Sequence, residues 1–235
     1  MSNIAIITAR GGSKRIPKKN IKMFCGKPII EYSIDAAFKA GIYDEIMVST
    51  DDKLIADISK NAGANVPFFR SEKTSNDYAT TADVLMEVFQ KYSENGKEFD
   101  YATCIYPTAP FITGEKLKTG MEKLKEKKGK ILMPIVRYSF PPQRSMIMKN
   151  GELLLKWPEN RNKRSQDLEA FYHDCGQFYC YDVRTFINQK GQYTDGIIPL
   201  ELPDTEVQDI DNIEDWLIAE MKYRLMVEQG DKINE

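Results

Sequence analysis

Short apolar runs alternate with amphipathic stretches along most of the chain. The apolar, β-branched runs predict strands at Ile4–Thr8, Glu45–Ser49, Val66–Phe69, Tyr101–Tyr106, Ile131–Val136, Gln177–Asp182 and Ile197–Leu202. Apolar residues at helical spacing predict helices at Glu31–Ala40, Lys53–Ala62 (with Asp52 as its N-cap), Thr81–Tyr92, Glu115–Lys127 and Ile213–Val227. Such alternation is typical of an α/β fold, a mainly parallel twisted sheet with helices on both faces. Ligands of these sheets bind outside the carboxyl ends of the strands.

The alternation is interrupted between residues 138 and 172. Pro141 and Pro142 are followed by a turn at Lys149-Asn150-Gly151-Glu152 and by a polar run, a pattern that predicts a hairpin-like excursion. The sequence contains neither repeats nor a low-complexity linker. We therefore expect a single domain over residues 1–235, with an inserted arm at about 138–172.

Composition and charge exclude several classes of function. The 33 Lys and Arg residues nearly balance the 35 Asp and Glu residues, so no overall positive field attracts nucleic acid or an anionic membrane. No apolar run approaches the roughly 20 residues that span a bilayer, and the first residues lack the pattern of a signal peptide. The four cysteines show no metal-site spacing. We expect a cytoplasmic protein with reduced thiols.

A basic, glycine-containing loop directly follows the first predicted strand. Gly11 and Gly12 let the backbone turn sharply and bring N–H groups close to a phosphate. Five cations within ten residues can neutralise a triphosphate locally: Arg10, Lys14, Arg15, Lys18 and Lys19. The spacing is not that of a Walker A loop, which disfavours a P-loop kinase or GTPase. A solvated basic turn is the alternative interpretation.

A pair of carboxylates precedes the last predicted helix. Asp209 and Asp211 are two residues apart, so both face the same side of an extended segment. A strand there would carry them to the carboxyl edge of the sheet, and two adjacent carboxylates repel unless a cation or proton intervenes. Alternatively, Asp211 and Glu214 form a capping box at the start of the helix.

Several segments, in their order along the chain, resemble the acylneuraminate cytidylyltransferases. They are Arg10-Gly11-Gly12-Ser13-Lys14 with Pro17, Lys19 and Asn20, then Gly26-Lys27-Pro28-Ile29, Val48-Ser49-Thr50-Asp51-Asp52, Pro107-Thr108-Ala109-Pro110, Arg164-Ser165-Gln166-Asp167-Leu168 and Asp209-Ile210-Asp211. The resemblance covers nearly the whole chain. It implies a nucleotide-diphospho-sugar transferase-like fold and an enzyme that transfers CMP from CTP to the anomeric hydroxyl of a nine-carbon acidic sugar, releasing pyrophosphate. It also implies that Asp209 and Asp211 coordinate Mg²⁺, the hard cation that nucleotidyl transfer needs.

Three further segments resemble those of the family members that act on pseudaminic acid, which implies this sugar as the acceptor. They are Tyr106-Pro107-Thr108-Ala109-Pro110-Phe111, Ser139-Phe140-Pro141-Pro142-Gln143-Arg144 and His173-Asp174-Cys175-Gly176-Gln177-Phe178-Tyr179. Sialic acid enzymes typically carry Gln where Tyr106 stands, so Tyr106 either contacts the substrates or packs in the core. Sialic, legionaminic and 3-deoxy-octulosonic acid are alternative acceptors, and a catalytically silent nucleotide-binding protein is a third interpretation.

The resemblance also assigns residues to the nucleotide. Arg10, Ser13 and Lys19 match positions that hold the CTP phosphates, and Arg70 matches an arginine that recognises cytosine. The remaining nucleotide-binding candidates are Gly11, Gly12, Lys14, Asn20, Thr80 and Thr81. Thr80 and Thr81 also suit the start of a helix. With Asp209 and Asp211, Arg10 and Lys19 make up the predicted catalytic set, while the general base stays open between a metal-bound water, a carboxylate and the substrate itself.

Sugar binding is assigned to residues later in the chain. Arg164 is the candidate for the sugar carboxylate, with Arg144 and Gln143 as alternatives, although a solvated charge run is the usual fate of such residues. His173, the only histidine, is expected to bind rather than to catalyse, and a packed or surface position is the simpler interpretation. The other candidates are Tyr106, Gln177 and Phe178. The resemblance further implies that the arm reaches across a homodimer.

Overall fold

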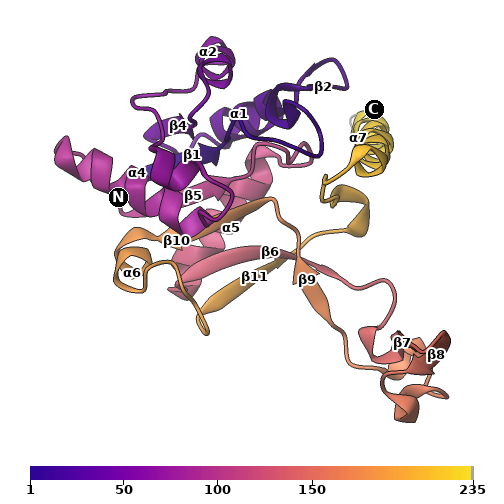
Figure 1. Cartoon of the computed structure of the whole chain (residues 1–235). Coiled ribbons are helices and arrows are strands. Elements are labelled where there is room, and N and C mark those ends of the chain that lie inside the picture. Colours follow the sequence, from indigo (N-terminus) through magenta and orange to yellow (C-terminus); the bar gives the residue numbers. More distant parts are fainter. Residues whose placement is uncertain (234–235) are drawn as a thin grey trace.

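The computed structural model describes residues 1–233, and the side chains of residues 1–228. A seven-stranded sheet crosses the molecule in the order β11-β6-β10-β5-β1-β4, with β9 beside β6 (Figure 1). Its strands are β1 (Asn3–Thr8), β4 (Glu45–Ser49), β5 (Tyr101–Ile105), β6 (Ile131–Arg137), β9 (Tyr172–Asp174), β10 (Phe178–Asp182) and β11 (Ile197–Glu201). β1 is parallel to β4 and β5, and β6 to β11, whereas β9 and β10 are antiparallel to their neighbours. The predicted α/β fold with a mainly parallel sheet is confirmed.

Helices cover both faces of this sheet because its central strand is apolar on both sides. Ala5 and Ile7 of β1 pack into one core cluster, while Ile4 and Ile6 pack into another, and all four are fully buried. The first cluster also takes residues from α1 (Ile29–Ala40), α2 (Lys53–Asn61) and α5 (Gly114–Lys127). The second takes residues from α4 (Thr81–Glu94) and α6 (Val183–Asn188). Short elements complete the body of the fold: η1 (Lys19–Ile21), β2 (Met23–Phe24), β3 (Lys27–Pro28), α3 (Glu72–Ser75) and η5 (Asp204–Glu206).

The C-terminal helix α7 (Ile213–Ile233) packs beside the segment that follows the basic loop. Trp216 is buried against Phe24 in a third apolar cluster, to which Ile210 also belongs. The Asn212 side chain caps the helix, accepting hydrogen bonds from the backbone N–H groups of residues 214 and 215 at 2.8 and 3.0 Å. The alternative in which Asp211 and Glu214 form the cap is therefore wrong. Within residues 1–233, no helix has both the length and the apolarity needed to cross a bilayer.

One predicted strand is missing from the structure, and one segment that a strand would have carried to the sheet edge has another conformation. The run Val66–Phe69 forms no strand, and only its neighbour Asn65 makes an isolated bridge to Met47. Pro67 lies inside this run, and its missing N–H cannot extend a hydrogen-bonded ladder. The segment carrying Asp209 is likewise not a strand, but a connection between η5 and α7.

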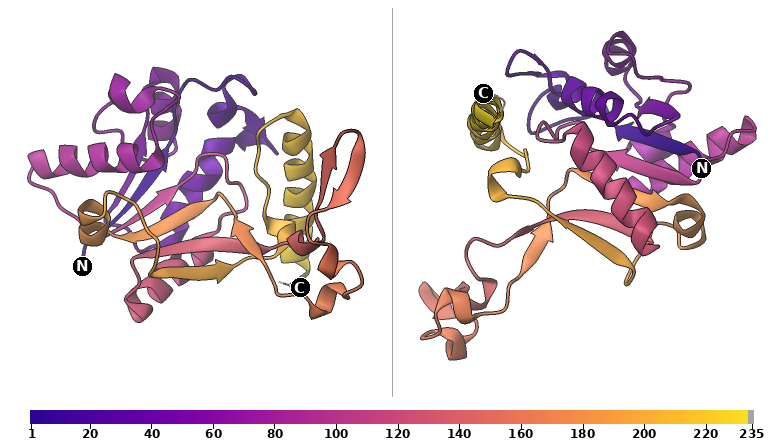
Figure 2. Two further views of the ribbon diagram at one scale, coloured as in Figure 1. Left: turned by 60° about the horizontal axis from the view of Figure 1, so that its bottom comes forward. Right: turned by 180° about the vertical axis from the view of Figure 1, so that it is seen from behind.

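The interruption in the sequence pattern is an arm that extends from one end of the sheet (Figures 1 and 2). It contains the hairpin β7 (Met146–Lys149) and β8 (Glu152–Leu155) and the turns η2 (Pro142–Arg144), η3 (Pro158–Asn160) and η4 (Ser165–Asp167). Asn150 and Gly151, at the hairpin turn, have φ values of 53° and 82°, the conformation that this residue pair favours. Apolar side chains of the hairpin, such as Met148 and Leu153, are largely exposed.

Candidate active site

A cavity of about 610 Å³ lies beyond the carboxyl ends of β1 and β5. Its wall is formed by the basic loop after β1, by parts of the segment 70–84, by residues 106–108 after β5, and by Asp211. This is the position expected for a ligand site in a sheet of this type. The cavity therefore gathers residues from four separate parts of the sequence.

Local hydrogen bonds fix the basic loop in place. The backbone N–H of Ala9 donates to the Ser49 carbonyl of β4 at 3.0 Å, and the Asn20 side chain donates to the Arg10 carbonyl at 2.8 Å. Ser13 closes a tight turn, with its hydroxyl donating to the Ile16 carbonyl at 2.6 Å. These bonds order the backbone, and four of the five cations of the loop line the cavity: Arg10, Lys14, Arg15 and Lys19, but not Lys18.

The two glycines of the loop have different roles. Gly12 lines the cavity, and a Cβ atom added there would meet no other atom within 4 Å. Gly11 instead donates its N–H to Asp51 at 2.8 Å, and an added Cβ would lie 2.8 Å from a carboxylate oxygen of Asp52. Gly11 thus permits a close approach to the start of α2 and is not part of the cavity wall, which differs from the phosphate-facing role predicted for it.

Lys19 links the basic loop to the segment before α7. Its ammonium donates to the Ile210 carbonyl at 2.6 Å. Burial lowers the pKa of Lys19, although the carboxylates of Asp211 and Asp209 act in the opposite direction. Asp211 forms an ion pair with Arg15 at 2.7 Å and lines the cavity, whereas Asp209 does not reach the cavity wall.

Asp77, which the sequence patterns did not single out, lines the cavity and contacts the basic loop. Its two carboxylate oxygens pair with Arg10 at 2.7 Å and with Lys14 at 2.6 Å. Hydrogen bonds from Lys14 and Arg10 lower the pKa of Asp77. An exposed acidic residue in a polar loop carries no local signal of function, so only the folded chain shows that it pairs with two of the predicted phosphate ligands.

Arg70 is buried at the cavity wall. Its guanidinium donates to the Ser49 carbonyl at 2.7 Å and to the Ser49 hydroxyl at 3.2 Å, and its backbone N–H donates to the Thr50 carbonyl at 2.9 Å. Burial lowers the pKa of this guanidinium, and the nearby Asp51 and Glu87 carboxylates partly offset that effect. A guanidinium held this way has a fixed orientation, with its unused N–H groups available to an acceptor in the cavity.

Thr80, Thr81 and Tyr106 form the wall next to Arg70. Thr80 caps α4 in a capping box with Asp83, so the helix-start interpretation holds for it. The Thr81 hydroxyl lies 3.2 Å from the Tyr106 hydroxyl, and both residues line the cavity. The Tyr106 ring packs edge-on against Tyr179 at 5.6 Å between centroids, so Tyr106 packs in the core and also contributes to the cavity wall.

The arm residues predicted to bind sugar lie away from this cavity. Arg164 pairs with Asp167 through two hydrogen bonds of 2.7 and 2.9 Å, and Arg144 contacts Ser165 at 3.1 Å, all within the arm. The Gln143 side chain likewise donates to a backbone carbonyl of the arm, that of residue 169. Figure 1 shows the arm well separated from the basic loop after β1. A single chain therefore does not bring these residues to the cavity that the basic loop lines.

The β9–β10 residues predicted to bind sugar are also outside the cavity. His173 is exposed on β9, with its ring 4.7 Å from that of Tyr138 between centroids. Gln177 is 2% exposed and donates to the Glu206 carbonyl at 2.7 Å. Phe178 is fully buried in the core, because β10 lies inside the sheet and its residues 178–181 are buried on both faces, so its predicted contact with substrate is wrong for this structure.

The carboxylates near the cavity can supply some of the ligands of a cation, but the protein alone does not supply a full set. Among the residues with described side chains, no cluster of three or more His, Cys, Asp and Glu residues has metal-binding geometry. Asp211 offers one carboxylate at the cavity wall, and Asp209, which also acts on the Lys19 ammonium, offers a second one nearby in sequence. Mg²⁺ in nucleotide sites commonly uses one or two carboxylates together with substrate phosphates, so this donor set fits an ion that the nucleotide helps to hold.

The fold and the cavity together define the chain as an α/β protein with a basic site beyond the carboxyl ends of its parallel strands. A solved structure of CMP:2-keto-3-deoxy-manno-octonic acid synthetase complexed with CTP superposes with a TM-score of 0.70 at 18% identity, over 97% of this chain and all of that one, which supports the fold alone. The profile of the family described as Cytidylyltransferase matches residues 4–194. The chain belongs to the cytidylyltransferase family.

Two curated relatives match nearly from end to end. Pseudaminic acid cytidylyltransferase of Campylobacter jejuni is 36% identical over 226 residues, which cover 96% of this chain and 97% of that protein. CMP-N,N'-diacetyllegionaminic acid synthase of Legionella pneumophila is 32% identical over 232 residues, with coverages of 96% and 97%. The family resemblance noted in the sequence is thus confirmed.

Proposed function

We propose that this protein transfers CMP from CTP to the anomeric hydroxyl of a nine-carbon acidic sugar, with pseudaminic acid as the acceptor. The observation that carries the proposal is the single cavity in which the basic loop, the buried guanidinium of Arg70 and the Thr81–Tyr106 pair meet. The relative from Campylobacter jejuni, named for pseudaminic acid, supports the choice of acceptor.

In this arrangement one end of the cavity binds the triphosphate of CTP and the other end binds its cytosine ring. Arg10, Lys14 and Lys19 neutralise the triphosphate, and Arg70 donates to acceptors on the cytosine ring. The sugar oxygen forms a bond to the α-phosphorus as the bond to the departing pyrophosphate breaks, and the hydroxyl proton is lost. Such a transfer depends on alignment and charge neutralisation, which fixed cationic groups supply without reorganisation.

We assign the Mg²⁺ ligands to Asp211 and Asp209. When bound, the ion would neutralise charge on the phosphate oxygens. The ion pair between Arg15 and Asp211, at 2.7 Å, keeps that carboxylate at the cavity wall beside Lys19.

We further propose that two chains associate through the arm. Phe140, Met148 and Leu153 are 86%, 75% and 64% exposed, and the hairpin that carries the last two has little apolar core of its own. Burying such side chains between two copies is a common basis of symmetric dimers. Association of this kind also offers Arg144 and Arg164 a route to the cavity of a second chain, because neither residue reaches the cavity of its own.

A cytoplasmic location completes the proposal. The four cysteines all lie in the described region and all carry free thiols, as expected in a reducing compartment. CTP, the proposed substrate, is supplied inside the cell.

Pyrophosphate release tests the proposal directly. CTP, UTP, ATP and GTP are each assayed against pseudaminic, legionaminic, sialic and 3-deoxy-octulosonic acid. We expect turnover with CTP and pseudaminic acid to exceed that with any other pair, since a site that hydrogen-bonds one base leaves polar groups unpaired with another. Higher turnover with legionaminic acid would reassign the acceptor. Binding of CTP without pyrophosphate release from any pair would indicate a silent nucleotide-binding protein.

A further inference from the structure

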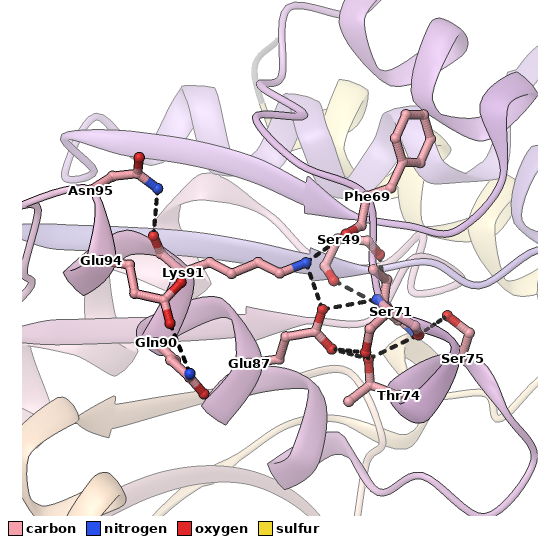
Figure 3. A network of polar contacts seen from close by, with 11 residues as sticks. Ser49, Phe69, Ser71, Thr74, Ser75, Glu87, Gln90, Lys91, Glu94 and Asn95 are labelled. Carbon is pink, nitrogen blue, oxygen red and sulfur yellow. Dashed lines mark hydrogen bonds and ion pairs between the residues drawn. The ribbon is translucent and has the colours of Figure 1, made fainter.

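The backbone on both sides of Arg70 is tied to helix α4. The Phe69 carbonyl accepts a hydrogen bond from the Lys91 ammonium at 2.7 Å, and the Ser71 N–H donates to the Glu87 carboxylate at 2.9 Å (Figure 3). Glu87 and Lys91 lie one turn apart on α4 and pair with each other at 2.7 Å. We call these two side chains the Glu87–Lys91 clamp.

The second carboxylate oxygen of Glu87 strengthens this attachment. It accepts hydrogen bonds from the hydroxyls of Ser71, at 2.7 Å, and of Thr74, which itself lines the cavity. Burial raises the pKa of Glu87, but hydrogen bonds from Lys91, Thr74 and Ser71 outweigh that effect and lower it to about 2. Glu87 therefore remains ionised, and the clamp intact, at any pH near neutrality.

The clamp complements the contacts that Arg70 makes with β4. Ser49 and Thr50 hold the guanidinium and the N–H of Arg70 from one side, while α4 holds the residues before and after it from the other. Residues 66–69 form no strand, so no sheet ladder fixes the approach to Arg70. Side-chain hydrogen bonds from α4 take the place of that ladder.

We propose that Glu87 and Lys91 are positioning residues that set the orientation of Arg70 for pyrimidine recognition. Neither residue belongs to the wall of the nucleotide cavity, so any effect on the nucleotide passes through the segment 69–74. The inference deepens the proposed function and rests on it.

The test compares Glu87→Gln and Lys91→Gln with Glu94→Gln as a matched control. Glu94 is on the same helix, is also hydrogen-bonded one turn away, to Gln90 at 2.8 Å, and does not touch the segment that carries Arg70 (Figure 3). In both clamp variants we expect the KM for CTP to rise about tenfold, the size expected for one weakened hydrogen bond to a charged group. The kcat and the KM for the sugar should change less than about twofold, and the preference for CTP over UTP should narrow.

Rescue and exchange measurements separate positioning from a loss of folded protein. Lys91→Arg should keep the KM for CTP close to that of the wild type, unlike Lys91→Gln, because a guanidinium can also reach both the Phe69 carbonyl and Glu87. Amide hydrogen exchange over residues 69–75, measured without nucleotide, should be faster in Glu87→Gln and unchanged in Glu94→Gln. If Glu87→Gln fails to fold, Lys91→Gln serves as the test, since it leaves in place the hydrogen bonds that Ser71 and Thr74 donate to Glu87.

Two outcomes overturn the inference. One is an unchanged KM for CTP in the clamp variants, and the other is a fall in kcat alone, which would follow from a smaller fraction of folded enzyme. A wild-type protein that releases no pyrophosphate from CTP would instead refute the proposed function. The nucleotide-free exchange data keep these two failures distinguishable.

Discussion

A substitution at Asp211 should change the turnover of the enzyme strongly and its stability only slightly. The Asp211 carboxylate lines the cavity and pairs with Arg15 at 2.7 Å, but it does not cap helix α7, which Asn212 does. Asp211→Asn should therefore remove a metal ligand while leaving the helix start intact. Both partners of the ion pair are substantially exposed, so its loss should cost at most about 1 kcal/mol of unfolding free energy.

A loss of that size corresponds to a fall in Tm of no more than about 2–4 °C in a chain of this length. The expected effect on turnover is much larger, a fall by orders of magnitude at low Mg²⁺ that higher Mg²⁺ partly relieves, because an amide oxygen is a weaker ligand than a carboxylate. Asp209→Asn should act in the same direction, because its carboxylate, like that of Asp211, is near enough to Lys19 to raise the pKa of that ammonium.

Asn212→Ala is the matched control. It removes the cap of α7 and should cost about 1 kcal/mol of stability with near-normal turnover. Pyrophosphate release is measured over a Mg²⁺ titration for each variant, alongside thermal melts. If Asp211→Asn keeps wild-type turnover at every Mg²⁺ concentration, the assignment of the metal site is wrong.

Three further variants test other parts of the site. Asp77→Asn should tighten CTP binding several-fold in calorimetric titrations, because Arg10 and Lys14 lose a competing internal carboxylate; weaker binding would contradict this reasoning. Hydrogen bonds lower the pKa of Glu87 from 4.5 to about 2, so wild type should be more stable than Glu87→Gln by on the order of 2 kcal/mol above pH 4.5. In denaturant melts this difference should shrink as the pH falls from 4.5 toward 2, and a constant difference would exclude Glu87 ionisation as its cause. Arg164→Lys should raise the KM for the sugar and leave that for CTP unchanged, since an ammonium cannot form a bidentate pair with a carboxylate; a change in the KM for CTP alone would count against its assignment.

Local patterns along the chain were sufficient to predict most of the elements. The apolar run Ile4–Thr8 predicts a buried strand because a parallel strand covered on both faces needs no polar alternation. The Asn150-Gly151 pair predicts a hairpin turn because both residues tolerate positive φ. The Gly-rich basic loop predicts a phosphate site because its cations are neighbours in sequence. In each case the determining interactions lie within a few residues of one another.

The tertiary structure decided what depends on residues far apart in sequence. A period-two pattern does not specify strand direction, so the antiparallel placement of β10 between β5 and β6 is visible only in the folded sheet. The same packing buries Phe178 and brings Asp77 opposite Arg10. It also places the arm away from the cavity of its own chain. These relations arise from the way helices and strands pack on each other, and no local propensity encodes them.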